Sequence, residues 1–276
     1  MKINHKALVT SLLVLSFGVA LVANANHSWG SYHWARESNP FTLKLGDNVS
    51  ASWDSYLNTS SSQWSLSSVL DTSVVAGGTN NTKGRSTPKN CVPTSGRVEI
   101  CSENYGNTGW LGIAQIWVSG GHIVQGTTKL NDTYFNSGFY NTPGWRSLVV
   151  CQEVGHNFGL GHQDEDFNNL PVDPHTCMDY FVPDANEIVG PNAHDYEELD
   201  LIYSHLDSFN SYDDGSSGDS GSGGNGNGKG KPSIVNLDNP SEWGRSLKQD
   251  AQGKDNLFVR DLGNGRKVFT HVFWAR

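Results

Sequence analysis

The spacing of apolar residues predicts alternating strands and helices up to residue 206. Apolar and polar residues alternate over 41–45, and β-branched residues dominate 69–76, so each segment is expected to form a strand. Further strands are expected at 98–100, 111–118 and 122–130, and helices at 52–63, 142–158 and 195–206. The glycine-containing turn at 119–121 predicts that the two longest strands form an antiparallel hairpin.

A change of composition near residue 211 ends this pattern. Residues 211–232 are mostly Gly, Ser, Asp and Asn, which cannot offset the entropy of ordering, so a flexible linker is expected there. Apolar residues return in 233–276, where Asn264-Gly265 between two apolar runs is typical of a hairpin turn. We therefore expect a main domain at 26–210, a linker at 211–232 and a small β-rich appendage at 233–276.

The first 25 residues have the pattern of a signal peptide. Lys2 and Lys6 precede an apolar run over 7–22, and Ala23-Asn24-Ala25 matches an A-x-A cleavage site. The alternative is an uncleaved N-terminal anchor, which is disfavoured because the cleavage site follows the apolar run so closely. We expect export to the periplasm or the extracellular space, with no stable insertion in a membrane.

Composition and charge exclude two classes of protein. Nine Trp, nine Tyr and eleven Phe are too many aromatic residues for a disordered chain. Only 19 Lys and Arg stand against 28 Asp and Glu, and removing the signal peptide takes the formal net charge from −9 to −11. Because phosphate contacts need clustered cations, no nucleic-acid partner is expected.

Four cysteines in an exported chain favour two disulfides over free thiols. Three pairings are open, and closeness along the chain favours Cys91 with Cys101 and Cys151 with Cys177. A metal site built from cysteines is disfavoured because the sequence has no C-x-x-C pair.

The most informative segment lies at the end of the predicted helix 142–158. Gln152 and His156 are four residues apart and share a helix face, with Glu153 on its adjoining edge. Gly159 allows the chain to turn sharply, which brings His162 back toward the same point. Two imidazoles beside a carboxylate suit a catalytic zinc ion, with the carboxylate accepting a proton from water.

These residues resemble the zinc motif of the metzincin metallopeptidases. The motif E-x-x-H-x-x-G-x-x-H is present as Glu153, His156, Gly159 and His162, and Thr176-Cys-Met178-Asp-Tyr180 resembles the Met-turn of that family. The resemblance implies an α+β zincin fold, with a twisted mixed sheet, an active-site helix and Met178 beneath the metal. It also implies a zinc-dependent endopeptidase that acts on peptide or protein substrates, with Glu153 as general base. Together with the signal peptide this predicts a secreted protein, and we expect a monomer. Calcium is a second candidate ion.

One position departs from the family pattern. The first zinc ligand of the family is a histidine, and the corresponding residue here is Gln152, whose amide oxygen is a poorer zinc ligand than an imidazole nitrogen. In some metzincins a tyrosine at the position of Tyr180 reaches the zinc, and Asp164 or Asp166 could also supply an oxygen. The alternative function is therefore a non-catalytic exported binding protein that keeps the fold and weak or structural metal binding.

The spacing of the other histidines does not indicate a catalytic or metal-binding role. His122, His175, His194, His205 and His271 are expected in surface or structural roles, although His175 and His194 could approach the site. If the protein is a peptidase of this type, an extended peptide substrate would add to the edge of the hairpin at 111–130.

Overall fold

The computed structural model describes residues 27–78, 90–136, 138–169, 175–212, 237 and 239–276. Its strands are β1 (His33–Trp34), β2 (Phe41–Asn48), β3 (Leu70–Ala76), β4 (Val98–Glu103), β5 (Trp110–Ser119), β6 (His122–Asn131), β7 (Arg245–Gln249), β8 (Asp255–Gly263) and β9 (Arg266–Trp274). Its α-helices are α1 (Asp54–Trp64), α2 (Asp132–Phe135), α3 (Pro143–His156) and α4 (Ala193–Ile202), with 3₁₀ turns at Gly138–Tyr140 and Pro240–Glu242. The predicted signal peptide lies outside these ranges.

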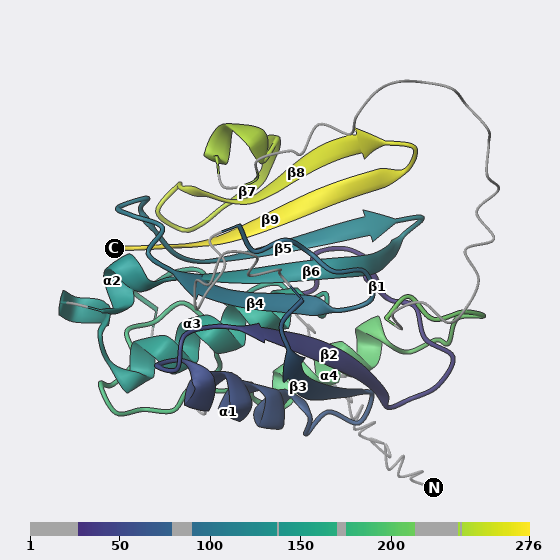
Figure 1. Cartoon of the computed structure of the whole chain (residues 1–276), viewed down its shortest axis with the longest axis horizontal. Coiled ribbons are helices and arrows are strands. Elements are labelled where there is room, and N and C mark those ends of the chain that lie inside the picture. Colours follow the sequence, from purple (N-terminus) through teal and green to yellow (C-terminus); the bar gives the residue numbers. More distant parts are fainter. Residues whose placement is uncertain (1–26, 79–89, 137, 170–174, 213–236, 238) are drawn as a thin grey trace, which may run out of the picture.

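The strands form one mixed sheet in the order β3-β2-β4-β6-β5-β9-β8-β7, with β1 paired to β6 (Figure 1). Strands β3, β2, β4 and β6 are parallel, whereas β5 runs antiparallel to β6. The predicted α+β class and the hairpin at 111–130 are thereby confirmed, and every helix and strand predicted up to residue 206 is present within a few residues of its expected bounds.

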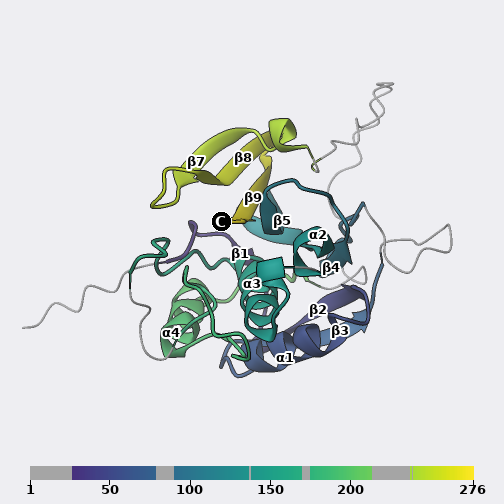
Figure 2. The same ribbon diagram turned by 90° about the vertical axis from the view of Figure 1, so that its left-hand side faces the viewer.

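Helix α3 is the central helix, and it lies on the same side of the sheet as α1 and α4 (Figure 2). It begins where the sequence predicts, because the Thr142 side chain accepts a hydrogen bond from the backbone N–H of Trp145 and Pro143 occupies the first turn. Its residues from 144 to 156 are all buried, and it packs against α1, β5, β6 and β9. Packing within the protein therefore fixes the position of α3 without a bound ligand.

The C-terminal strands differ from the expected appendage. Strand β9 pairs antiparallel with β5 along nearly its full length, and β8 and β7 continue the same sheet (Figure 1). Phe269 and Phe273 of β9 belong to the main hydrophobic core. The physical reason is that β5 would otherwise be an edge strand with unpaired backbone groups. Strand β9 pairs with these groups and adds its apolar face to the core. The boundary at 211–232 stays a prediction, because nearly all of that segment lies outside the described residues.

Both favoured disulfides are present, joining Cys91 to Cys101 and Cys151 to Cys177. Within the described ranges, none of the helices combines the length and apolar character that a membrane crossing requires.

Candidate metal centre and active site

The end of α3 brings the two motif histidines together. Beyond His156 the helix stops, and Gly159 adopts a φ of +103°, a left-handed conformation that favours glycine. The chain then returns so that Nε2 of His162 lies 2.9 Å from Nε2 of His156. Zinc–nitrogen bonds in a tetrahedral site would hold two such atoms roughly 3.3 Å apart. The predicted convergence of these imidazoles is therefore present, within a few tenths of an ångström of a metal geometry.

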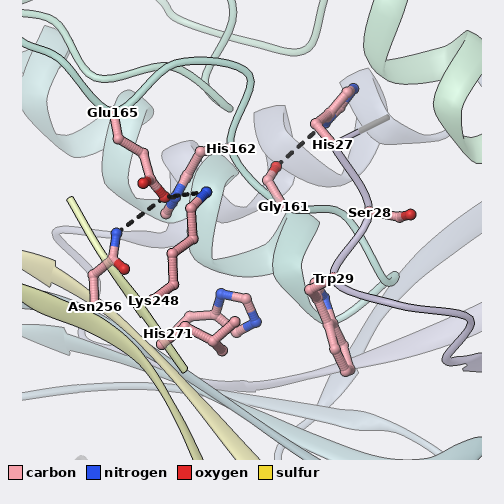
Figure 3. A pocket seen from close by; sticks show the side chains of 10 residues that line it. His27, Ser28, Trp29, Gly161, His162, Glu165, Lys248, Asn256 and His271 are labelled. Atoms are coloured by element: carbon pink, nitrogen blue, oxygen red, sulfur yellow. Dashed lines mark hydrogen bonds and ion pairs between the residues drawn. The ribbon is translucent and has the colours of Figure 1, made fainter. Parts of the chain in front are cut away.

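Each of these imidazoles is oriented through its other ring nitrogen. Nδ1 of His156 lies 2.8 Å from the carbonyl oxygen of Leu160, and Nδ1 of His162 lies 2.5 Å from Oε1 of Glu165. Figure 3 shows Glu165 between His162, Lys248 and Asn256, and the last two contact its Oε1 at 3.0 Å each. Metal-binding histidines are commonly held in this way, with Nδ1–H donated to a carbonyl or carboxylate.

The electrostatic environment keeps His156 neutral. Burial, and then the neighbouring His162, lower the pKa of His156 well below its ordinary range. Burial raises the pKa of Glu165, but its hydrogen bond and charge interaction with His162, together with Lys248, bring the pKa to about 2. Metal binding requires a neutral imidazole, and the ionised form of Glu165 is the one that accepts Nδ1–H from His162.

Gln152 lies one turn before His156 on α3 and is completely buried. Neither its amide oxygen nor its amide nitrogen forms a hydrogen bond with any residue of the described ranges. A buried amide with both ends unpaired is costly and needs an explanation such as an ion or water. We take this as support for Gln152 as an oxygen donor to a metal held by the two histidines.

Glu153 lies between α3 and β5. A Cβ on Gly112 would come within 2.8 Å of Oε1 of Glu153, so the glycine leaves room for the carboxylate. Burial raises the pKa of Glu153 well above its ordinary range, and the backbone of Ala114 lowers it only in part. Burial therefore favours the neutral form of this carboxyl.

Met178 lies against the motif helix, as expected from the resemblance. A Cβ on Gly155 would come within 2.7 Å of its sulfur, so Met178 packs against the helix one residue before His156. The Cys151–Cys177 disulfide ties the neighbouring residues of the two segments together. Whether this segment acts as a Met-turn depends on the metal and stays a prediction.

The other predicted oxygen donors divide into two groups. Tyr180 is buried, with its ring 4.7 Å from that of His162, and burial together with Glu165 raises the pKa of its hydroxyl well above the ordinary value. Asp164 and Asp166 instead accept hydrogen bonds within their own loop, from the backbone of Asp166 and of Asn168 respectively. The carboxylate that reaches His162 belongs to Glu165, which the sequence reading missed because it fits no spacing of the motif.

A third histidine reaches the site from the C-terminal strand. The ring of His271 on β9 stacks on that of His156, with centroids 4.1 Å apart and planes at 17°. Its Nε2 is buried without a hydrogen bond to the described residues, and burial, followed by the charges of His156 and His162, lowers its pKa well below the ordinary value. His271 was expected in a surface or structural role, but it lies against His156 and lines the pocket. His175 pairs instead with Glu187, and His194 pairs with Glu197 while its ring lies 4.8 Å from that of His27 at the pocket.

The edge of β5 is not open to a substrate. In the register of the sheet, Ala114 of β5 faces His271 of β9, so β9 occupies the edge to which an extended peptide was expected to add. A pocket of about 130 Å³ remains beside His162 and His271, lined also by His27, Trp29 and Lys248 (Figure 3). Because β9 pairs with β5 and β4 pairs with β6, neither edge of the hairpin is free, and the expectation of an accessible edge is wrong.

The donor set fits zinc better than calcium. Two neutral imidazoles with orienting partners and one buried amide oxygen suit a borderline ion, whereas calcium takes six to eight oxygens. The fit is incomplete. The described residues hold one group of three His, Cys, Asp or Glu side chains whose donor atoms all lie within 4.8 Å of one another, and it is elsewhere in the molecule.

Comparison with known proteins adds one structural likeness. No family model matches the sequence, and no curated protein matches it. Among solved structures, the chain is similar to high choriolytic enzyme 1, a hatching enzyme zinc-protease from Oryzias latipes (medaka fish). The TM-score is 0.34 and the identity 13%, over 62% of this chain and 94% of that chain. A likeness of this size does not show a shared family.

Proposed function

We propose that the protein is a secreted zinc-dependent endopeptidase of metzincin type whose active site is closed by its own C-terminal strand. The observation that carries the proposal is the pair of motif imidazoles, whose Nε2 atoms lie 2.9 Å apart while each Nδ1 contacts an oxygen acceptor. With Nδ1–H donated in each ring, the two neighbouring Nε2 atoms would be available to bind one ion, which two histidines in ordinary surface roles do not need. The two disulfides support an exported location.

Each residue of the motif has a separate role in this proposal. His156, His162 and Gln152 would hold zinc, which polarises a carbonyl and lowers the pKa of water when it is bound. Glu153 would accept a proton from water and donate it to the leaving amine. Tyr180, beside His162, is the further candidate for contact with the reacting group.

Closure by β9 also controls the protonation of Glu153. In the closed structure its carboxyl is buried, which raises its pKa and favours the form that cannot accept a proton. If β9 leaves β5, water reaches the carboxyl, its pKa falls toward the ordinary range, and the same edge becomes free for a peptide. Displacement of β9 would thus supply both the general base and the substrate-binding edge.

Two observations favour the alternative, a non-catalytic exported protein with weak or structural metal binding. Gln152 is a weak zinc ligand, and His271 fills the space above His156 where a substrate would otherwise lie. In this alternative β9 is a permanent part of the sheet.

The experiment compares zinc content and cleavage of an unstructured protein for the wild type, Glu153→Gln and Gln152→His. We expect Glu153→Gln to keep zinc while cleavage falls by about 10²–10⁴-fold, since the carboxylate serves the proton rather than the ion. Gln152→His should bind zinc more tightly. Glu197→Gln, on an exposed side chain of α4, is the matched control.

The outcomes separate the two functions. Cleavage that Glu153→Gln abolishes and Glu197→Gln leaves unchanged supports the endopeptidase. Zinc binding without cleavage, even after β9 has been loosened by substitution, supports the non-catalytic alternative. A folded Gln152→His variant that binds no zinc contradicts both, because the two imidazoles would then not form a metal site.

A further inference from the structure

Three histidines and one aspartate meet at a second place, away from the motif. Strand β1 pairs in parallel with the start of β6, and the register puts His33 directly beside His122, with ring centroids 4.9 Å apart. His205 and Asp207 come from the segment that follows α4, and the ring of His205 lies 4.7 Å from that of His33. The chain thus contributes to this second histidine cluster from three distant parts of its sequence.

Asp207 lies at the centre of the cluster. Its Oδ2 is 3.3 Å from Nε2 of His33, and its Oδ1 is 3.1 Å from Nε2 of His122 and 3.8 Å from Nε2 of His205. The ligand atoms of His33, His122 and Asp207 all lie within 4.8 Å of one another. The backbone N–H of Asp207 donates to the carbonyl of Arg36, which fixes the aspartate beside β1.

The hydrogen bonds of His33 satisfy only one of its two ring nitrogens. Its Nδ1 lies 2.9 Å from the carbonyl oxygen of Ser31, which can only accept, so Nδ1 carries the proton of the neutral ring. The lone pair of Nε2 then faces a carboxylate oxygen, and this buried nitrogen forms no hydrogen bond to the described residues. Such an arrangement is unfavourable unless His33 is doubly protonated or a cation lies between the two groups.

We propose that His33, His122, His205 and Asp207 bind a divalent transition-metal ion, zinc by preference, in a site separate from the motif. Three imidazoles and one carboxylate are a donor set that favours zinc over magnesium or calcium. The carbonyl of Ser31 orients His33 in the way that backbone carbonyls orient metal-bound imidazoles. The ion would fasten β1, the β5–β6 turn and the segment after α4 to one another.

The competing explanation is that no metal binds, and that protonated histidines and Arg36 form the ion pairs with Asp207. Asp207 Oδ2 accepts from the backbone N–H of Arg36 at 3.1 Å and lies 3.5 Å from Nη1 of its guanidinium. However, that guanidinium also donates from Nε to Asn39 and from Nη2 to the carbonyl of Tyr203. Arg36 therefore accounts for Oδ2 of Asp207, whereas Oδ1 lies at hydrogen-bond distance from Nε2 of His122 and 3.8 Å from Nε2 of His205.

The test uses the full exported chain with His156→Gln and His162→Gln, so that only the second cluster is available. We expect this protein, after treatment with a chelator, to bind about one equivalent of Zn²⁺. Its Tm should rise by about 5 °C or more at a hundredfold excess of zinc over Kd. Bound Co²⁺ should show the visible absorption of a four-coordinate site.

Two further substitutions are chosen to spare the fold. The side chains of His205 and His122 are 58% and 21% exposed, so His205→Gln and His122→Gln should fold normally but lose the bound equivalent and the rise in Tm. His175→Gln, at an exposed histidine paired with Glu187, is the matched control and should retain both. The proposal is overturned if the His122→Gln protein binds zinc as well as the control does. It is also overturned if zinc changes the Tm of neither protein while lowering the pH changes the Tm of both.

Discussion

The motif site and the second histidine cluster are built from the same types of side chain, imidazoles and carboxylates, but differ in burial and in where the carboxylate lies. At the motif, His156 and His162 are buried under β9, and the nearest carboxylate, Glu165, contacts the ring nitrogen directed away from the other imidazole. In the second cluster, Asp207 lies among the imidazoles themselves, and His205 is largely exposed. As proposed, the motif would combine two imidazoles with an internal carboxyl for chemistry, whereas the second cluster has three donor groups close together, with His205 as a fourth beside Asp207, and suits a structural ion.

Loosening β9 should have the largest effect, and only at the motif. Phe273 is almost completely buried and its ring lies 4.9 Å from that of Tyr180. Phe273→Ala should lower the free energy of unfolding by about 3–5 kcal/mol. It should also speed the removal of zinc from the motif by a chelator, with little change at the second cluster.

The control for this change is Leu247→Ala, on an exposed side chain of β7. It should alter stability by less than about 0.5 kcal/mol. Equal acceleration of zinc loss at both sites would mean that Phe273→Ala unfolds the whole protein rather than opening the cleft.

The two disulfides should differ in their effect on the motif. Replacing Cys151 and Cys177 by serine opens a loop with a separation of 26 residues and should cost about 3.5 kcal/mol, against about 2.7 kcal/mol for Cys91 and Cys101, separated by 10. Zinc affinity at the motif should fall only in the first case, because Cys151 and Cys177 adjoin Gln152 and Met178. Denaturation curves and zinc titrations measure the two effects, and equal affinity in both variants would show that the Cys151–Cys177 bridge does not shape the site.

The smallest of these effects concerns the orienting carboxylate. Glu165→Ala should weaken zinc binding at the motif by about 10–100-fold, since His162 loses the partner of its Nδ1. The second cluster should be unaffected, because the backbone of Ser31 orients its His33. Glu187→Ala, which removes the partner of His175, controls for the loss of a carboxylate near a histidine. Weaker binding at both clusters would contradict the separation of the two sites.

The sequence predicts that the two motif histidines converge because its signal is local. The spacing of Glu153, His156, Gly159 and His162 reflects one helix and one turn, so their convergence follows from helix geometry. The strands and helices up to residue 206 are predicted for the same reason, since periodicity is a property of each segment alone.

The parts that the sequence does not predict depend on the pairing of distant strands. Nothing near His271 indicates that β9 pairs with β5, and nothing near His33 indicates that β1 pairs with the start of β6. A Gly- and Ser-rich segment before the last strands suggests an independent appendage, although such a linker is also long enough to let them return to the sheet. Local patterns cannot distinguish the two arrangements.

The most direct test of the motif site is zinc content in a protein that lacks the second cluster. With His122→Gln and His205→Gln in place, the folded chain should bind about one zinc ion, and adding His162→Gln should abolish that binding. Circular dichroism establishes that each variant is folded. Zinc retained after His162→Gln, or no zinc bound by the folded parent, would contradict the account.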